Sequence, residues 1–471
     1  MTRFLKHIIL FVLFAFTQQT WAQFDTTELK ESMSFETYLA YVKKHHPLMK
    51  QANIVLTSGE ANLLKARGGF DPKVEVDYDR KKFKSKEYYD QLNATFKIPT
   101  WYGIEFKANY ENNTGEFLNR ASTVPEDGLY SAGVSFSLAQ GLLMNERMAT
   151  LKKARFFQQQ SQADRDVLVN SVLYDASKAY FEWLEATNEQ NIYQGFLENA
   201  TARMKAVERS VAVGDKASID ITEIRITVQT RQLELEAAKL KRMKAILSVS
   251  NYLWINDIPM ELQDDVVPIY PERTILARAL LLDQNVNQDQ LLINHPKLLS
   301  LNAKIKGLEV DRSLKRNNLL PKVDLQYNFL STEYDQANSF NTANYKAFVN
   351  VGFPIFLRKE RGAVRLANLK LKGANLERAF VKVSIENKIQ AVNAELNSLR
   401  VQNELIENIV KDYETMVAAE ERKFFVGESS LFLINSRERK LIDAQLKENA
   451  LLIKQLKAVV KLQNTLGILG D

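Results

Sequence analysis

A helical pattern that occurs twice constrains the fold of this chain more than any other feature. Over residues 176–213, and again 213 positions later over residues 389–426, residues recur at alternating spacings of three and four to form a largely apolar stripe. This spacing is typical of a coiled-coil seam and predicts two long helices. The seam positions are Ala176, Ala179, Trp183, Ala186, Gln190, Tyr193, Leu197, Ala200, Met204, Val207 and Val211, and then Ile389, Val392, Leu396, Leu399, Asn403, Ile406, Val410, Tyr413, Val417, Glu420 and Phe424.

Each seam ends at a glycine, which predicts a helical hairpin. Val213-Gly214-Asp215 closes the first seam and Val426-Gly427-Glu428 closes the second, and another long helical pattern follows each of them. Glycine adopts the left-handed conformation that ends a helix. We expect the first long helix to run from about residue 146 to residue 213, a length of about 100 Å at 1.5 Å per residue. An ordinary globular domain has no need of such a helix.

Other landmarks also occur twice and indicate an internal duplication. His46-Pro47 and His295-Pro296 lie 249 positions apart, as do Pro72-Lys73 and Pro321-Lys322. Proline interrupts a helix, so we expect a helical break at each His-Pro pair. Because the two histidines share one position, helix geometry explains them better than a metal site does. The polar seam residues Gln190 and Asn403 also share a position, which favours a role in helix register over lining of a duct.

After each Pro-Lys pair, apolar and polar residues alternate, which predicts strands with one apolar face. We expect four strands in the first copy and two in the second. The offset between the copies falls from 249 to 213 here, so the first copy carries about 36 extra residues. These residues form a predicted hairpin over 89–112, with Trp101 and Tyr102 in its turn. The two aromatic residues belong either to an interfacial girdle of a membrane barrel or to packing at its rim.

The first residues and the composition indicate an exported chain. A basic start, the apolar run 8–16 and small residues up to Ala22 predict a cleaved signal peptide. No later segment has the length and apolarity of a transmembrane helix. The absence of cysteine excludes disulfides, thiolate metal sites and an acylated cysteine. The formal charge of +6 is too small and too dispersed for nucleic-acid binding.

These patterns divide the chain into four parts. We predict a signal peptide over residues 1–22, a first structural repeat over 23–255, a non-helical connector with three prolines over 256–271, and a second repeat over 272–471. The first repeat holds a helix, four strands and a long helical hairpin, and the second holds a helix, two strands and a long hairpin. No constellation of nucleophile and base stands out, so we assign no catalytic residue, cofactor or metal.

Strands of this kind in an exported protein are typical of an outer-membrane barrel, although a soluble sheet with one wet face shows the same alternation. Long helices on both sides of each strand group require an even strand number, and four and two are both even. Six strands cannot close a useful lumen, and an open edge in lipid leaves backbone groups unsatisfied. Several protomers are therefore expected to share one barrel.

The order of these elements, found twice, resembles the TolC-like outer-membrane efflux proteins over nearly the whole mature chain. The resemblance implies an α+β membrane protein: a homotrimer with an outer-membrane β-barrel continued by an α-helical barrel across the periplasm. It implies a periplasmic adaptor protein and an inner-membrane pump or ABC exporter as partners. The added hairpin departs from the family pattern and leaves open whether the barrel has 18 or 12 strands.

The resemblance also implies roles for the two tips. Val213, Gly214, Asp215, Val426, Gly427 and Glu428 are expected to dock the adaptor, beside exposed apolar residues at Val213, Ala217, Ile219, Val426, Leu431 and Phe432. The family closes its periplasmic end with an aspartate, a tyrosine, an arginine and an aspartate ring. The matching positions here are Asp220, Phe424, Ser429, Leu433 and Ser436. Only the first aspartate is kept, so we expect no cation-binding ring.

Three functions fit the sequence to different degrees. The favoured one is the export duct of a tripartite efflux pump or type I secretion system. A periplasmic adaptor or coiled-coil tether without a channel is the alternative, and the membrane-type strands count against it. A passive porin would not need 100 Å helices.

Overall fold

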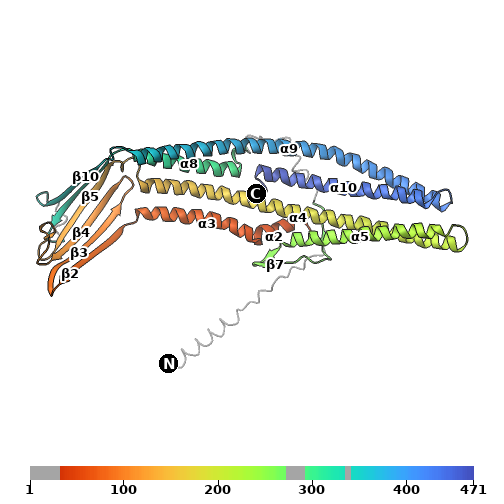
Figure 1. The fold of residues 1–471 in the computed structure, drawn as a ribbon, viewed down its shortest axis with the longest axis horizontal. Helices are drawn as coiled ribbons and strands as arrows, with labels where there is room; N and C mark the ends of the chain where they lie inside the picture. Colours follow the sequence, from red (N-terminus) through yellow and green to blue (C-terminus); the bar gives the residue numbers. More distant parts are fainter. Residues whose placement is uncertain (1–31, 272–291, 335–340, 471) are drawn as a thin grey trace, which may run out of the picture.

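The computed structural model describes residues 32–271, 292–334 and 341–470, and shows an elongated molecule with a sheet at one end and long helices extending from it (Figure 1). The predicted signal peptide lies outside the described residues, as does the start of the predicted second repeat. Among the described residues, no helix combines the length and the apolar character needed to cross a membrane.

The predicted break at the first His-Pro pair is confirmed, and a helix starts directly after each of the two pairs. Helix α2 (Phe35–His45) stops at His46, and α3 (Pro47–Arg67) starts at the next residue. The His46 side chain caps α3, because its Nδ1 accepts a hydrogen bond of 3.2 Å from Leu48 N. In the second copy, His295 Nδ1 accepts from Lys297 N at 3.1 Å at the start of α8 (Pro296–Asn317). Both histidines therefore serve as helix caps, and burial lowers the pKa of each imidazole.

The six predicted strands form one antiparallel sheet in the order β10-β9-β5-β4-β3-β2. The predicted extra hairpin, β3–β4, lies inside the sheet between β2 and β5. The four-plus-two division of the strands is therefore confirmed. Their bounds are β2 (Lys73–Phe83), β3 (Lys86–Pro99), β4 (Ile104–Thr114), β5 (Leu129–Ala139), β9 (Lys322–Ser331) and β10 (Tyr345–Gly352).

Two long helices run from the sheet to the opposite end of the molecule, and shorter helices pack along them (Figure 1). The long helices are α4 (Glu146–Ala212), within one residue of the predicted bounds, and α9 (Arg358–Phe425), which ends at the second predicted glycine turn. Next to the sheet, neighbouring helices pack in the order α3, α4, α8 and α9. Beyond the middle, α5 (Ile219–Ser250) and α10 (Leu431–Leu466) replace α3 and α8, so the order is α5, α4, α10 and α9.

The predicted seams are the packing faces of the long helices. Trp183 and Ala186 of α4 are fully buried, and so are Val392 and Leu399 of α9. The polar seam residue Asn403 donates a hydrogen bond of 2.7 Å to Gln455 Oε1 of α10. A paired amide at this place fixes the relative register of α9 and α10.

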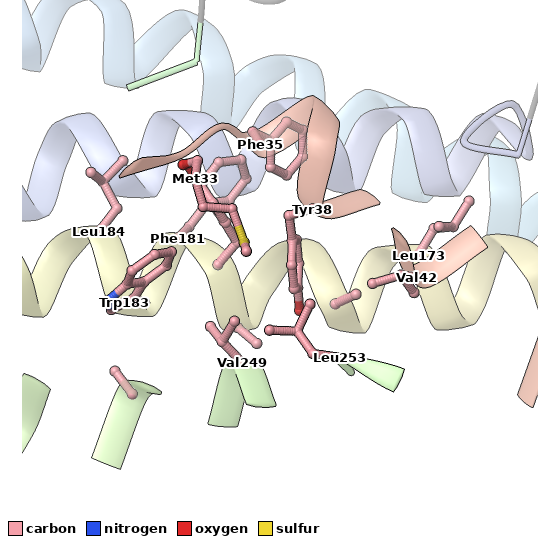
Figure 2. Packing of buried hydrophobic residues seen from close by; sticks show 14 of the residues in the cluster. Met33, Phe35, Tyr38, Val42, Leu173, Phe181, Trp183, Leu184, Val249 and Leu253 are labelled. Atoms are coloured by element: carbon pink, nitrogen blue, oxygen red, sulfur yellow. The ribbon is translucent and has the colours of Figure 1, made fainter. Parts of the chain in front are cut away.

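The largest apolar core lies halfway along the molecule, where the N-terminal segment crosses α4 (Figure 2). Strand β1 (Ser32–Met33) pairs in parallel with β8 (Val267–Pro268), and β6 (Trp254–Ile255) pairs with β7 (Ile258–Pro259). The buried Tyr180 hydroxyl ties both segments to α4. It lies 2.8 Å from Met33 O and 2.7 Å from Ile269 O, and accepts from Ile269 N at 3.1 Å. These short strands were not predicted.

Replacing Tyr180 with phenylalanine is expected to lower the free energy of unfolding by about 0.5–1.5 kcal/mol, because Ile269 O loses its hydroxyl donor, whereas Ile269 N and Met33 O remain bonded to each other at 3.0 Å. The matched control is Tyr38→Phe in the same core, since the buried Tyr38 hydroxyl has no hydrogen-bond partner among the described residues. Denaturant unfolding and hydrogen exchange at the Ile269 amide measure both variants. Equal stability of the two variants would show that the hydrogen bonds of the Tyr180 hydroxyl do not stabilise this core.

Candidate functional site

The register of the sheet gathers most apolar residues of its six strands on one face, whereas Leu330 and Phe348 lie on the other. One row passes from Val74 through Phe96, Ala108 and Ala132 to Phe329, and the next strand continues it. The apolar face consists of Val74, Val76, Tyr78, Leu92, Ala94, Phe96, Ile98, Phe106, Ala108, Tyr110, Tyr130, Ala132, Val134, Phe136, Leu138, Val323, Leu325, Tyr327, Phe329, Tyr345, Ala347, Val349 and Val351.

Much of this face is open to solvent within the single chain. Val74 is 71% exposed on one edge strand and Val351 is 65% exposed on the other, while Phe106 near the centre is 50% exposed. A contiguous apolar surface of this extent marks contact with a membrane or another protein.

The opposite face is polar and its charges balance. Lys97 pairs with Glu75, Ser137 Oγ donates to Asp324 Oδ1 at 2.8 Å, and Lys346 lies 3.4 Å from Glu111. Six cationic and six anionic side chains belong to this face by register: Lys73, Lys81, Lys97, Lys107, Lys322 and Lys346, and Glu75, Asp77, Asp79, Glu105, Glu111 and Asp324. The sheet thus separates an apolar surface from a hydrated one.

Both edges of the sheet are unpaired. Every residue of β2 and of β10 is exposed, and each strand uses only one side of its backbone for hydrogen bonds within the chain. Because the sheet has an even number of antiparallel strands, the two edge strands run in opposite directions. A second copy placed edge to edge would continue the antiparallel pattern.

The turn of the extra hairpin lies against the helices. The Trp101 ring stacks on Phe70 at 5.6 Å between centroids and joins a cluster with Leu63 and Leu151 of α3 and α4. Asn145, which caps α4, donates to Trp101 O at 2.9 Å. This geometry favours packing at the rim for Trp101, whereas Tyr102 is exposed.

The two helical tips share one backbone geometry. Gly214 and Gly427 have φ of +88° and +85°. After α4, Asp215 N donates to Ser210 O at 2.9 Å, and after α9, Glu428 N donates to Lys423 O at 2.8 Å. With the second bond from each glycine N–H, both ends are Schellman motifs, which need a left-handed residue where glycine stands.

Apolar side chains surround the tips, with one exception to the prediction. Val213 is 72% exposed and Val426 is 71% exposed. Ala217, Ile219 and Phe432 are exposed as well, and so is the unpredicted Phe425. The prediction was wrong for Leu431, which is buried because it opens α10 on the face that packs against the other hairpin.

The predicted gate residues are spread over different environments. Phe424 is buried with Val207 and Ile224 of the neighbouring hairpin, and Lys216 Nζ lies 3.5 Å from the centroid of its ring. Ser429 Oγ donates to Glu420 Oε1 at 2.5 Å. Asp220 is half-buried in the first turn of α5, and Leu433 and Ser436 are exposed on α10. Within the described residues no hydrogen bond or ion pair links Asp220 to Ser429.

A buried ion cluster that the sequence did not predict joins the two hairpins near the tips. Glu438 of α10 is buried, and Arg203 of α4 donates to its two carboxylate oxygens at 3.3 and 3.1 Å. Arg203 also reaches Glu421 of α9 at 2.8 Å, and Arg231 of α5 lies 3.9 Å from Glu438. All four helices contribute. A charged residue beside a coiled-coil seam has no sequence signal that separates it from a solvated one.

Known proteins with a similar sequence are outer-membrane export proteins. The family model described as outer membrane efflux protein matches residues 287–468. Pyoverdine export outer membrane protein OpmQ of Pseudomonas putida is 22% identical over 314 residues, which cover 65% of this chain and 64% of OpmQ, less than two thirds of its length. The resemblance to TolC-like outer membrane efflux proteins is confirmed.

Solved channel structures share the fold over most of the chain. The Campylobacter jejuni CmeC outer membrane channel has a TM-score of 0.63 at 15% identity, covering 92% of this chain and 85% of CmeC. The open state of the Neisseria gonorrhoeae MtrE outer membrane channel has a TM-score of 0.65 at 13% identity, covering 92% of this chain and 88% of MtrE.

Changing Glu438 to glutamine is expected to cost about 1–3 kcal/mol of stability, because Arg203 and Arg231 lose their shared buried carboxylate and keep only Glu421 and Glu234 as partners. The control Glu421→Gln removes a half-exposed partner of Arg203 and should cost less than about 1 kcal/mol. Hydrogen exchange of α4 and α10 near the tips and thermal unfolding measure both. A larger effect for Glu421→Gln would show that the cluster does not depend on Glu438.

Proposed function

We propose that this chain is one protomer of a trimeric export channel of the outer membrane of a Gram-negative-type bacterium, with its helices extending into the periplasm. The observation that carries the proposal is the exposed apolar face between two unpaired strands of opposite direction. Lipid would cover that face, and neighbouring protomers would pair the strands, which satisfies the backbone groups that an open edge leaves bare.

The stagger of the sheet supports closure into a barrel. From Lys73, at the helix-side end of β2, a hydrogen-bonded row ends at Lys346 of β10, whereas the helix-side end of β10 is Gly352. The row passes through Lys97, Lys107, Gly133 and Asn328. Six residues over five strand steps correspond to a tilt of ~40° at about 3.3 Å per residue and about 4.8 Å per strand. Barrel strands tilt by about 35–45°.

Because β3 and β4 lie within the sheet, a trimer would place 18 strands in the barrel and not 12. A barrel of about 18 strands leaves a water-filled lumen. The polar face, with its balanced charges, would line that lumen. We therefore infer a pore with little preference for the sign of the cargo's charge.

The helices offer matching edges. Helices α3 and α5 form one side of the protomer and α9 forms the other. Helix α5 exposes Ile226, Leu233, Leu240 and Leu247 at spacings of seven, and at the same distance from the tip α9 exposes Val401, Leu405, Ile409 and Met416. Apolar stripes on opposite sides of one chain favour head-to-tail assembly into a closed ring.

The chain order supports an internal duplication, with residues 23–255 and 272–471 as the two copies and 256–271 as the connector. Helix α3, four strands, α4 and α5 are followed by α8, two strands, α9 and α10. Three pairs of copies would present six hairpins at the tip end. Since Phe424 is buried inside its own protomer, we infer that apolar packing of the hairpins closes this end without a ring of aspartates.

We further propose that the tips dock a periplasmic adaptor, which connects the channel to an inner-membrane pump or ABC exporter. The relative OpmQ is described as a pyoverdine export protein, which supports a role in export. A soluble periplasmic adaptor or tether would leave the apolar sheet face exposed to water, and a porin needs no long helices to form a pore. Recovery of a heat-modifiable trimer from the outer-membrane fraction tests the proposal against the tether alternative.

Spin labels at Phe96 and Phe106 are expected to contact lipid, because both positions lie on the apolar face of the extra hairpin. Labels at Thr95 and Lys107, one residue away on the polar face, are the matched controls and should contact water. Accessibility to oxygen and to a polar nickel reagent distinguishes the two environments. Water contact at all four positions would exclude the extra hairpin from the barrel wall and return the count to 12.

Valine at both Gly214 and Gly427 is expected to abolish export, since a β-branched residue does not tolerate the left-handed conformation that shapes the tips. No atom of another residue lies within 4 Å of an added Cβ at either glycine, so the effect is conformational. Asparagine at the same positions is the control, because it tolerates this conformation and should retain export. Trimer assembly should survive in both variants. Normal export by the valine variant would contradict docking at the tips.

A further inference from the structure

The tip of the β2–β3 hairpin, at the end of the sheet away from the helices, is strongly basic. Five of the seven residues from 80 to 86 are lysine or arginine. The two-residue turn is Lys84-Ser85, and both residues have positive φ, 46° and 61°. Such a turn prefers Asn-Gly, so a lysine here is not explained by turn geometry.

Three of these cations have no carboxylate partner. Arg80 pairs with Glu87 and Asp90, and Lys86 lies 3.8 Å from Glu116. Within the described residues, Lys81, Lys82 and Lys84 form no ion pair. The ion pairs of the hairpin therefore leave an excess of positive charge at its tip.

Aromatic rings lie among the free lysines. Lys81 Nζ is 5.0 Å from the centroid of the Tyr88 ring, and Lys84 Nζ is 5.5 Å from that of Phe83. Tyr88 packs in turn on Phe117 of the following loop at 4.7 Å. Aromatic rings and amines together are typical of the boundary between the apolar part of a membrane and its headgroups.

The basic tip continues the apolar face directly. On β2 that face holds Val74, Val76 and Tyr78, and the next residue on it is Arg80. If the apolar face contacts lipid tails, as the proposed function requires, the free lysines stand at the level of the headgroups. Cations at that level attract phosphate groups, and their attraction falls off within a Debye length.

We propose that Lys82 and Lys84 bind the phosphate groups of an anionic lipid in the outer leaflet. This inference rests on the proposed function, because the membrane level of the hairpin follows from it. Lys82 follows Arg80 on the apolar side of β2 and Lys84 lies in the turn, whereas Lys81 belongs to the polar face. The charge of Lys82 and Lys84 fits phosphate, and the position of Lys82 next to the apolar face selects a membrane lipid over a soluble anion. Each protomer of the trimer would carry one such site on its β2 edge.

The test uses the full chain in a neutral detergent and native mass spectrometry of bound lipid. The probes are diphosphorylated lipid A and phosphatidylcholine. The wild type is expected to prefer lipid A, and the double variant Lys82→Gln, Lys84→Gln should lose that preference by about tenfold or more. The double variant Lys372→Gln, Lys388→Gln removes the same charge from exposed helix positions and should bind like the wild type.

Two outcomes would overturn the inference. One is equal binding of lipid A by the hairpin variant and the wild type, and the other is displacement of lipid A by millimolar inorganic phosphate, which would indicate a site for free anions. Phosphatidylcholine reports on the apolar face alone. A wild type that holds no phosphatidylcholine contradicts the proposed function, whereas one that holds it without preferring lipid A contradicts only this inference.

Discussion

The common register of the six strands is the constraint on which the rest of the structure depends. A shift of one residue in any strand would move its apolar side chains to the polar face. Strands β5 and β9, which belong to the first four and the last two strands of the chain, meet at Gly133, where an added Cβ would lie 2.1 Å from Tyr327 O. Glycine thus permits the close approach that joins both strand groups into one two-faced sheet.

Contacts at the junction between the sheet and the helices determine which helices are neighbours. Asn317, at the end of α8, donates to Gln140 O and to Met144 O, just before α4 begins. Arg147 of α4 pairs with Glu105 of β4 at 2.6 Å. These contacts fix α4 and α8 as neighbours at the rim of the sheet, and the seams keep α4 and α9 in place from there to the tips.

Long periodic features could be predicted from the sequence because a period repeated over many residues outweighs local exceptions. Both long helices, the four-plus-two strands and the helix break at each histidine belong to this class. The pairing of β1 with β8, the Tyr180 tie and the Arg203–Glu438 cluster could not be predicted, because each depends on residues far apart in the chain. Leu431 was misplaced for a related reason: proximity to a turn does not say which face of the next helix a residue occupies.

Because α4 and α9 are continuous helices, a small rotation near their middle produces a large displacement at their ends. The core around Tyr180 packs on α4 near the midpoint of this helix, about 50 Å from the tip at 1.5 Å per residue. A rigid rod of that length moves its end by about 1 Å for each degree of rotation about that midpoint. A rotation of a few degrees in the packing around Met33 and Phe181 would therefore shift a tip by several ångströms, and the sheet end of α4, about equally far from Tyr180, by a similar distance in the opposite direction.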